Sequence, residues 1–354
     1  MSQWCNLKAM KKFVFLLILS ILVGCSQSPT INLRTRTFGK NPKNVFWIQI
    51  PGFEFEHIAM LRFSLADSRK PLAIEDVECV GSAWSYNLYD IRTNAVDSTL
   101  AQITGSQDIQ NACGGKDRFP VWQYYRSLGY QTLALEAGID NKSSLLNSSA
   151  CNGNTFLEGL TLLEMTKAPS KKDENKFFHY QSQKNLDLGS VHFDQTCQGN
   201  SGGCFASLSS NVQAMLEAAN AAPKGTFFLI RELNYLKYLK NGEIKKAREV
   251  LSEVNKTISL LKELENSDQN LILVTGAETQ SLRLPARGKE WSDFEKQGRN
   301  VKLERSRLVS PVLAKGPSAE NFCGVYEESK VLLRHFWRQD ESGYSLDKII
   351  ELMK

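Results

Sequence analysis

Short apolar runs rich in β-branched and aromatic residues alternate with amphipathic stretches along most of the chain after residue 44. Five of these runs have the length and composition of buried strands. They cover residues 45–50, 130–135, 226–230, 271–275 and 308–316. Strands that alternate with helices favour a sheet with helices on both faces. We therefore expect an α/β fold, a three-layer α/β/α sandwich with a mostly parallel central sheet.

The clearest helix in the sequence follows Glu243. Apolar residues recur there at steps of three and four, namely Ile244, Ala247, Val250, Leu251, Val254, Ile258, Leu261 and Leu264. That spacing places them on one face of a helix, which predicts an amphipathic helix packed on the sheet. A second helix is expected from Pro120 to a stop at Gly129. Residues 139–222 show less order and contain charged and glycine-rich loops.

The first 24 residues differ from the rest of the chain. Lys8, Lys11 and Lys12 precede an apolar run of residues 13–24. Twelve helical residues rise about 18 Å, which is too short for a bilayer core of about 30 Å, so the pattern is typical of a signal peptide. The run ends in Leu-Val-Gly-Cys, which resembles the bacterial lipobox and predicts lipidation of Cys25, with palmitate among its acyl chains. Ser26 at the next position favours the outer membrane.

Four segments follow from these patterns. Residues 1–24 are the predicted signal peptide, and residues 25–44 are a lipidated N-terminus and flexible tether. Residues 45–340 form a single α/β domain, and residues 341–354 a C-terminal helical tail with Ser345 as its cap. The expected location is the cell envelope, with the membrane as a partner through Cys25 and the domain in the periplasm or at the surface.

Charge and composition narrow the classes of function. The chain has 354 residues, 42% hydrophobic and 23% charged, with a net charge of +5. Removal of the signal peptide takes away three lysines and lowers this charge to +2. A nearly neutral mature chain gives no reason to expect nucleic acid as a partner.

Six cysteines remain after Cys5 and Cys25 are set aside. They are Cys79, Cys113, Cys151, Cys197, Cys204 and Cys323. An even number in an exported chain suggests three disulfides, and Cys197–Cys204 is the first pairing we expect. A competing interpretation has His192, Asp194, Cys197 and Cys204 bind a metal ion.

The segment from Ser310 to Ser329, SPVLAKGPSAENFCGVYEES, resembles the alkaline phosphatase superfamily. Members carry a late V-P-V-x-A-x-G-P-x-A-E-x-F-x-G-V-Y segment, and the order of the other predicted strands also fits. The resemblance implies an alkaline-phosphatase-like fold, and in the family two metal ions, usually zinc, activate a Ser or Thr nucleophile.

The residues that the family uses as metal ligands are missing here. Pro51-Gly52 stands where an Asp-Gly follows the first strand, and Ala277 and Glu278 stand where an Asp-His pair follows a later strand. The late histidine falls near Arg305. The Asp-x-x-x-His element maps to a stretch with Glu232 and Asn234. The only histidines are His57, His179, His192 and His335, none of them at these strand ends. We therefore predict no metal centre and no cofactor, with zinc only if the protein is an enzyme after all.

Ser82 is the weak candidate for a nucleophile. Gly81-Ser82-Ala83 resembles the Asp-Ser-Ala of the family, and a serine at a helix N-terminus would lie among free N–H groups that favour an anion. The alternative is that Ser82 only caps the helix. Glu232 with Arg231 and Glu278 with Arg283 are weaker candidates for substrate contacts, and the alternative for each is a solvated or structural ion pair. Six aromatic residues could line a pocket or belong to the core: Trp84, Tyr86, Tyr89, Trp122, Tyr124 and Tyr125.

Three functions remain open. The first is a lipid-anchored, non-catalytic protein with a phosphatase-like domain that binds a ligand or supports the envelope. The second is a hydrolase of phosphate or sulfate esters with a rebuilt site around Ser82, Glu232 and Glu278. The third is an adhesin or other partner-binding module. The sequence favours the first, with an unknown protein or small molecule as its ligand.

Overall fold

The structure is a computed structural model that describes most of the predicted domain. It covers residues 41–64, 71–110, 119–138, 143–147, 155–166, 177–178, 187–194, 196–197, 204–219, 224–286, 288–304 and 307–336. The signal peptide, Cys25, the tether up to residue 40 and the C-terminal tail lie outside these residues, so those expectations stay predictions. None of the described helices combines the length and the apolar character that a bilayer crossing requires.

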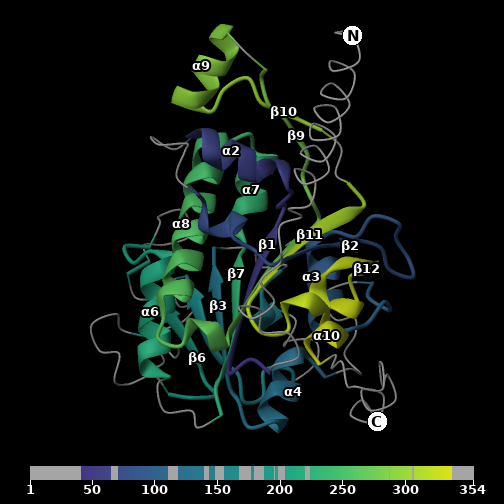
Figure 1. Cartoon of the computed structure of the whole chain (residues 1–354), viewed down its shortest axis with the longest axis vertical. Coiled ribbons are helices and arrows are strands. Elements are labelled where there is room, and N and C mark those ends of the chain that lie inside the picture. Colours follow the sequence, from purple (N-terminus) through teal and green to yellow (C-terminus); the bar gives the residue numbers. More distant parts are fainter. Residues whose placement is uncertain are drawn as a thin grey trace, which may run out of the picture. The chain divides into compact units, whose positions relative to one another are not determined.

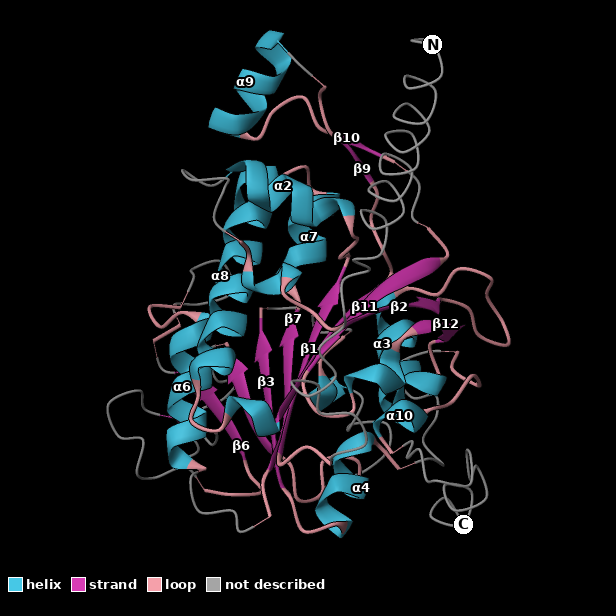
Figure 2. Ribbon diagram, viewed as in Figure 1, coloured by secondary structure: helices cyan, strands magenta, loops and turns pink. Residues whose placement is uncertain are grey.

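A ten-stranded sheet forms the centre of the domain (Figures 1 and 2). Its order is β12-β2-β11-β8-β1-β7-β3-β4-β6-β5. The strands are β1 (Asn44–Pro51), β2 (Cys79–Trp84), β3 (Gln131–Ala137), β4 (Thr161–Met165), β5 (Phe177–Phe178), β6 (Val191–Asp194), β7 (Thr226–Glu232), β8 (Asn270–Ala277), β11 (Val309–Lys315) and β12 (Gly324–Glu327). Only β11 runs antiparallel to its neighbours β2 and β8. The expected mostly parallel sheet is therefore confirmed.

Helices cover both faces of the sheet, as Figure 2 shows. One face carries α2 (Glu56–Ser64), α6 (Leu208–Ala218), α7 (Asn234–Lys240) and α8 (Ile244–Glu263). The other carries α3 (Ala95–Thr104), α4 (Val121–Ser127) and α10 (Lys330–His335). The predicted three-layer sandwich is confirmed, and α8 matches the predicted amphipathic helix. The segment between β8 and β11 contains the helix α9 (Gly288–Gln297). On either side of this helix lie the short strands β9 (Leu282–Arg283) and β10 (Lys302–Leu303), which pair antiparallel.

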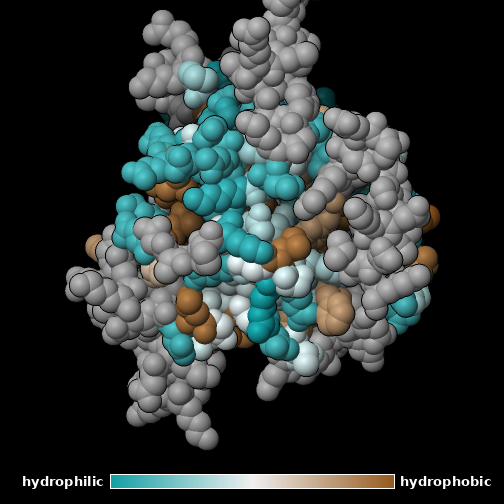
Figure 3. Space-filling model, turned by 60° about the horizontal axis from the view of Figure 1, so that its bottom comes forward, coloured by the Kyte–Doolittle hydropathy of each residue, from teal (hydrophilic) through white to brown (hydrophobic). Residues whose placement is uncertain are grey.

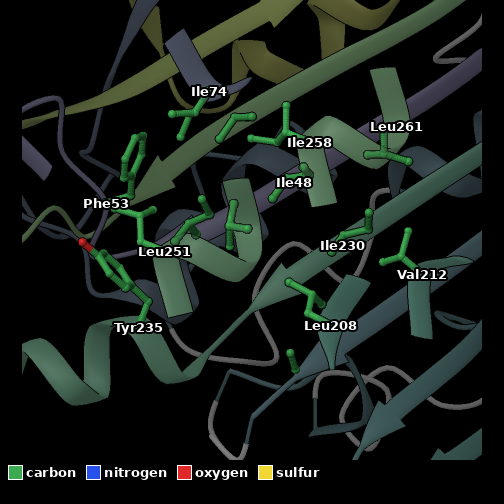
Figure 4. Packing of buried hydrophobic residues seen from close by; sticks show 14 of the residues in the cluster. Ile48, Phe53, Ile74, Leu208, Val212, Ile230, Tyr235, Leu251, Ile258 and Leu261 are labelled. Atoms are coloured by element: carbon green, nitrogen blue, oxygen red, sulfur yellow. The ribbon is translucent and has the colours of Figure 1, made fainter. Parts of the chain in front are cut away.

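The alternation of side chains along β1 explains why the sheet is buried on both faces. Val45 and Trp47 belong to the core under α3 and α4, whereas Phe46, Ile48 and Ile50 belong to the core under α8. Figure 4 shows Ile48 and Ile230 packed with Leu251 and Ile258 of α8. Because a parallel sheet is covered on both sides, its central strands are apolar throughout, and this makes them easy to predict.

The β12 end of the sheet departs from the three-layer pattern. Residues of β2 alternate between buried and exposed, with Cys79 and Ala83 buried and Val80 and Trp84 exposed. The buried side faces the core that includes Phe322 of the short helix η6 (Ala319–Phe322). One face of the sheet is thus open to solvent at this edge.

Two disulfides are present among the described cysteines. Cys197–Cys204 confirms the predicted pairing, and Cys79–Cys323 ties β2 to the residue after η6. Cys113 and Cys151 lie outside the described residues. Because both sulfurs of Cys197 and Cys204 are in a disulfide, neither is a thiolate ligand in this state. Asp194 accepts hydrogen bonds from Thr196 and Asn211.

Candidate active site at the carboxyl edge of the sheet

The helix α3 begins next to the carboxyl end of β8. Asn94 caps it, because the Asn94 side chain accepts a hydrogen bond from the Asp97 N–H at 3.0 Å. Gly105 ends the helix in the left-handed conformation at φ 68°. The first helical residue, Ala95, donates its N–H to the Glu278 carboxylate at 2.7 Å. The free N–H that would favour a bound anion is therefore occupied by an internal carboxylate.

Glu278 connects α3 to α7. One of its carboxylate oxygens accepts from Ala95, and the other pairs with the ammonium group of Lys240 at the end of α7. Its backbone has φ +43°, which is rare for a residue with a side chain and costs free energy of order 1 kcal/mol or more. The contacts to α3 and α7 hold the residue in this conformation. The expected partner Arg283 is replaced by Lys240.

The predicted position of Ser82 at a helix N-terminus is wrong. Ser82 lies in the middle of β2, beside Pro311 of β11 and Val325 of β12. The prediction failed because the apolar run before Ser82 continues as a strand to Trp84. The next helix starts only at Ala95. The missed signal was the capping residue Asn94 together with the glycine stop at Gly105.

Asp97 and Ser98 form the Asp-Ser pair that the structure places in this helix. Both are buried, in the first turn of α3 and just after it. The Asp97 carboxyl accepts a hydrogen bond from the Asn94 side-chain amide at 2.8 Å, and burial raises its pKa to about 6. Ser98 lies one turn after Asn94, since its N–H bonds to the Asn94 carbonyl at 3.0 Å. Sequence reasoning overlooked this pair.

Ser98 belongs to a buried polar cluster around Glu328. The Ser98 hydroxyl donates to Glu328 Oε1 at 2.5 Å, and the Ser85 hydroxyl donates to the same oxygen at 2.8 Å. Ser310 and Gln102 also direct donors at it, at 3.3 and 3.4 Å. Burial raises the pKa of Glu328 to about 7, although these donors oppose the shift. A carboxyl with this pKa can exchange a proton near neutral pH.

A second buried polar cluster surrounds Arg231 of β7. Arg231 forms an ion pair with Glu136 of β3, with both side chains shielded from solvent. It also donates to Gln49 at 2.9 Å and to the Thr99 hydroxyl at 3.1 Å, which links β1, β3, β7 and α3. Burial, followed by the charge of Glu136, raises the pKa of Glu164 well above its usual range. Arg231 therefore serves this cluster and not Glu232, its expected partner.

Glu232 ends β7 as a buried carboxyl. It accepts a hydrogen bond from the Asn234 N–H at 2.8 Å at the start of α7. Burial raises its pKa to about 8, with the backbone donors of Asn234 and Tyr235 opposing. The structure thus places Glu232 and Glu278 at the carboxyl ends of β7 and β8 but leaves Ser82 in β2.

Comparisons with known proteins bear on this architecture. No family model matches the sequence, and no curated protein does. The solved structures that resemble it include three alkaline phosphatases with TM-scores of 0.64 to 0.65. The alkaline phosphatase of the Antarctic bacterium TAB5 is 13% identical and covers 84% of this chain and 98% of its own. The cold-active alkaline phosphatase of a psychrophilic Shewanella is 14% identical over 82% and 98%, and that of Thermus thermophilus 11% identical over 88% and 94%. The fold is alkaline-phosphatase-like.

The residues at the sheet edge of this alkaline-phosphatase-like domain do not fit two zinc ions. Pro51 offers no ligand, and the Gly52 N–H bonds to the Ala277 carbonyl at 2.7 Å, which joins the ends of β1 and β8. A side chain on Gly276 would meet the Phe53 carbonyl at 2.6 Å, so this turn is closely packed. Among the described residues, the three potential ligands that lie within reach of one ion are Asp194, Cys197 and Cys204, outside this edge.

The three described histidines, His57, His192 and His335, make contacts within the protein. His57 accepts a hydrogen bond from the Glu54 N–H at 3.2 Å, and burial lowers its pKa to about 4. His335 packs against Trp47 and Tyr125, and burial lowers its pKa to about 3. His192 contacts the Asp187 carbonyl at 2.9 Å. His179 lies outside the described residues, as does Arg305.

The six aromatic residues do not come together around the edge of the sheet. Trp122 and Tyr125 are core residues, with the Trp122 N–H donated to the Phe156 carbonyl at 2.9 Å. Tyr124 packs on Phe336 near the same core. Trp84 and Tyr89 are exposed at the β12 end, where Tyr86 donates to Glu327. Trp122, Tyr124 and Tyr125 therefore belong to the core and do not line a pocket at this edge.

Proposed function

We propose that this chain is an exported, lipid-anchored protein whose alkaline-phosphatase-like domain is non-catalytic and serves binding or envelope structure. The contact that carries the proposal is the hydrogen bond from the Ala95 N–H to the Glu278 carboxylate. The first residue of α3 has no hydroxyl, and its N–H already holds an internal anion. A phosphate ester at this helix start would have to displace Glu278 and break its ion pair with Lys240.

Electrostatics at this edge supports the same conclusion. The positive end of a helix dipole stabilises one negative charge nearby, and Glu278 supplies that charge. Asp97 and Glu232 add carboxyls whose raised pKa values show that burial makes their charged forms costly. A second anion at this helix start would compete with Glu278 for both the helix dipole and the Lys240 ammonium group.

The lipid anchor is the other part of the proposal. It is supported by the basic region, the apolar run of residues 13–24 and the lipobox before Cys25. Two or three acyl chains, at about 0.8 kcal/mol per buried methylene, would hold the protein durably on a membrane. Ser26 favours the outer membrane.

Metal analysis and ester hydrolysis by the full purified chain test this function. We expect less than one equivalent of zinc and no hydrolysis of phosphate or sulfate monoesters above that of a Ser98→Ala and Ser82→Ala double variant. Stoichiometric zinc, or hydrolysis that the double variant lacks, would overturn the proposal. Palmitate labelling followed by detergent phase partitioning tests the anchor separately. The labelled protein should enter the detergent phase, and Cys25→Ser should abolish both the label and this partitioning.

A rebuilt-site hydrolase is the second candidate, and one contact favours it over a purely structural serine. Ser98 donates to Glu328, whose pKa of about 7 suits a general base. Ser98 is fully buried, however, so a substrate would reach it only after α3 or β12 moved. Hydrolysis lost in Ser98→Ala but kept in Ser82→Ala would support this site. Hydrolysis lost in Ser82→Ala but kept in Ser98→Ala would instead place the nucleophile at Ser82 in β2, away from Glu232 and Glu278.

A further inference from the structure

Six large apolar side chains are exposed at the β12 end of the sheet. They are Val80 and Trp84 of β2, Leu88, Tyr89 and Ile91 of the following loop, and Val325 of β12. We name this set the apolar edge surface. Ile91 is 77% exposed and Leu88 66%. In the view of Figure 3, the described apolar residues form small groups between hydrophilic ones.

Strand register and hydrogen bonds join these six residues into one surface. Val325 lies beside Ser82, between Val80 and Trp84 on the uncovered face of β2. Glu327 of β12 accepts hydrogen bonds from Tyr86 at 2.8 Å and from Gln107 at 2.9 Å. The Leu88 N–H in turn donates to the Gln107 carbonyl at 3.1 Å. The loop after β2 is therefore held beside β12, and Figure 1 shows it at the outer end of β2.

Two of the charged side chains beside this surface are engaged within the protein. Glu327 is held by Tyr86, Gln107 and Lys330, and Asp108 accepts from the Tyr89 hydroxyl at 2.5 Å. A partner of this surface therefore gains mainly apolar contact, with the exposed Asp90 between Tyr89 and Ile91. Contiguous exposed apolar groups of this kind mark an interaction site in a soluble domain.

The length of chain before the domain argues for a lipid surface as the partner. This step rests on the proposed anchor at Cys25. Residues 25–40 separate the lipid from the first described residue, and a flexible chain of that length spans about 22 Å on average. A domain of roughly 300 residues has a radius of gyration of about 19 Å, so it is wider than its tether is long. The anchor therefore keeps the domain close to the bilayer, and an exposed apolar face is the one that gains free energy from contact with it.

We propose that the apolar edge surface contacts the lipid bilayer and fixes the orientation of the anchored domain. Leu88, Ile91 and Val325 enter the boundary between headgroups and acyl chains. Trp84 and Tyr89 lie at the headgroup level, where aromatic side chains with a polar atom are favoured. Because the contact is apolar, zwitterionic lipid suffices and salt has little effect on it.

Quenching by brominated acyl chains tests this orientation on the full lipidated chain in zwitterionic vesicles. Ile91→Trp places a reporter in the surface. Phe205→Trp is the matched control, because Phe205 is 89% exposed near the opposite end of the sheet, after the Cys197–Cys204 pair. After subtraction of the parent signal, we expect the reporter at position 91 to be quenched about twofold more than that at 205. Adding Leu88→Asp and Val325→Asp to Ile91→Trp should remove the excess and leave vesicle flotation unchanged.

Each result decides between the anchor and the surface. Flotation with equal quenching at positions 91 and 205 overturns the surface and leaves the anchor intact. Loss of flotation overturns the anchor, and the orientation with it. A dimer in detergent by light scattering that Leu88→Asp and Val325→Asp dissociate would overturn the lipid contact in favour of a second copy of the chain. Excess quenching at position 91, unchanged in high salt, supports the proposal.

Discussion

The hydroxyl of Ser98 donates a hydrogen bond to the Glu328 carboxylate in a place that water does not reach. Both side chains are fully buried, and Ser85, Ser310 and Gln102 direct their donors at the same oxygen. The other oxygen, Glu328 Oε2, has no hydrogen bond within the described residues. Burial makes the charged form of this carboxyl costly and is the cause of its raised pKa, which the donors around Oε1 only partly oppose.

Glu328→Gln should make the free energy of unfolding less dependent on pH. The folded protein binds the Glu328 proton up to about pH 7, whereas the unfolded chain releases it near 4.5. Stability is therefore lost as pH rises through this window, by about 3 kcal/mol for this carboxyl alone. Urea unfolding at pH 5, 6, 7 and 8 should give a shallower decline for the variant.

Glu327→Gln is the matched control for this change. Its carboxylate is the neighbouring residue but is partly exposed, so the pH dependence of unfolding should stay that of the parent. Equal slopes for the parent and the Glu328 variant would show that the proton is not held at Glu328.

The success of the sequence predictions follows from burial. The central strands are apolar on both faces, and α8 repeats its apolar residues with helical period, so both were visible without a structure. β2 was missed because its exposed positions Val80 and Trp84 are apolar too, and the run has no period-2 pattern. This hid the strand around Ser82.

The sequence did not reveal the two buried polar clusters, and the reason is the distance between their residues along the chain. Gln49, Glu136, Arg231 and Glu328 are far apart in the chain, and each alone has the appearance of a surface residue. Only the register of β1, β3 and β7 places Gln49, Glu136 and Arg231 side by side. Glu278 was selected from the family resemblance, but its bond to Ala95 depends on where α3 begins.

Arg231→Met should lower the free energy of unfolding by about 3–5 kcal/mol, because it leaves the Glu136 charge buried beside Glu164 without a cation. The double variant Arg231→Met with Glu136→Gln should recover part of this loss. Arg126→Met removes an exposed ion pair with Glu158 and should cost at most about 1 kcal/mol. Chemical denaturation at pH 7 measures all three, and an Arg231 variant as mild as the Arg126 control would contradict the assignment.

His335→Phe should make the domain more resistant to acid. Burial among Trp47, Tyr125 and Phe336 lowers the pKa of His335 to about 3, from 6.5 in the unfolded chain. The stability that depends on the neutral ring is present above pH 6.5 and is lost as pH falls towards 3. Phenylalanine cannot take up the proton, but it loses the contact with the Tyr125 hydroxyl at 3.2 Å at every pH. Thermal unfolding from pH 7 to pH 4 should therefore show a smaller decrease in Tm for the variant, and parallel decreases would refute the prediction.

The two disulfides should differ in their contribution to stability. Cys79–Cys323 closes a segment with a sequence separation of 244, whereas Cys197–Cys204 closes one of 7. In the chain-entropy model, a longer closed loop removes more freedom from the unfolded chain, and this difference amounts to about 3 kcal/mol. Cys79→Ser with Cys323→Ser should therefore lower the free energy of unfolding well beyond Cys197→Ser with Cys204→Ser, because the first pair also fixes β2 to the segment that leads into β12. Urea unfolding of both double variants under oxidising conditions makes the comparison, and equal losses would mean that the unfolded chain stays compact without the long-range bond.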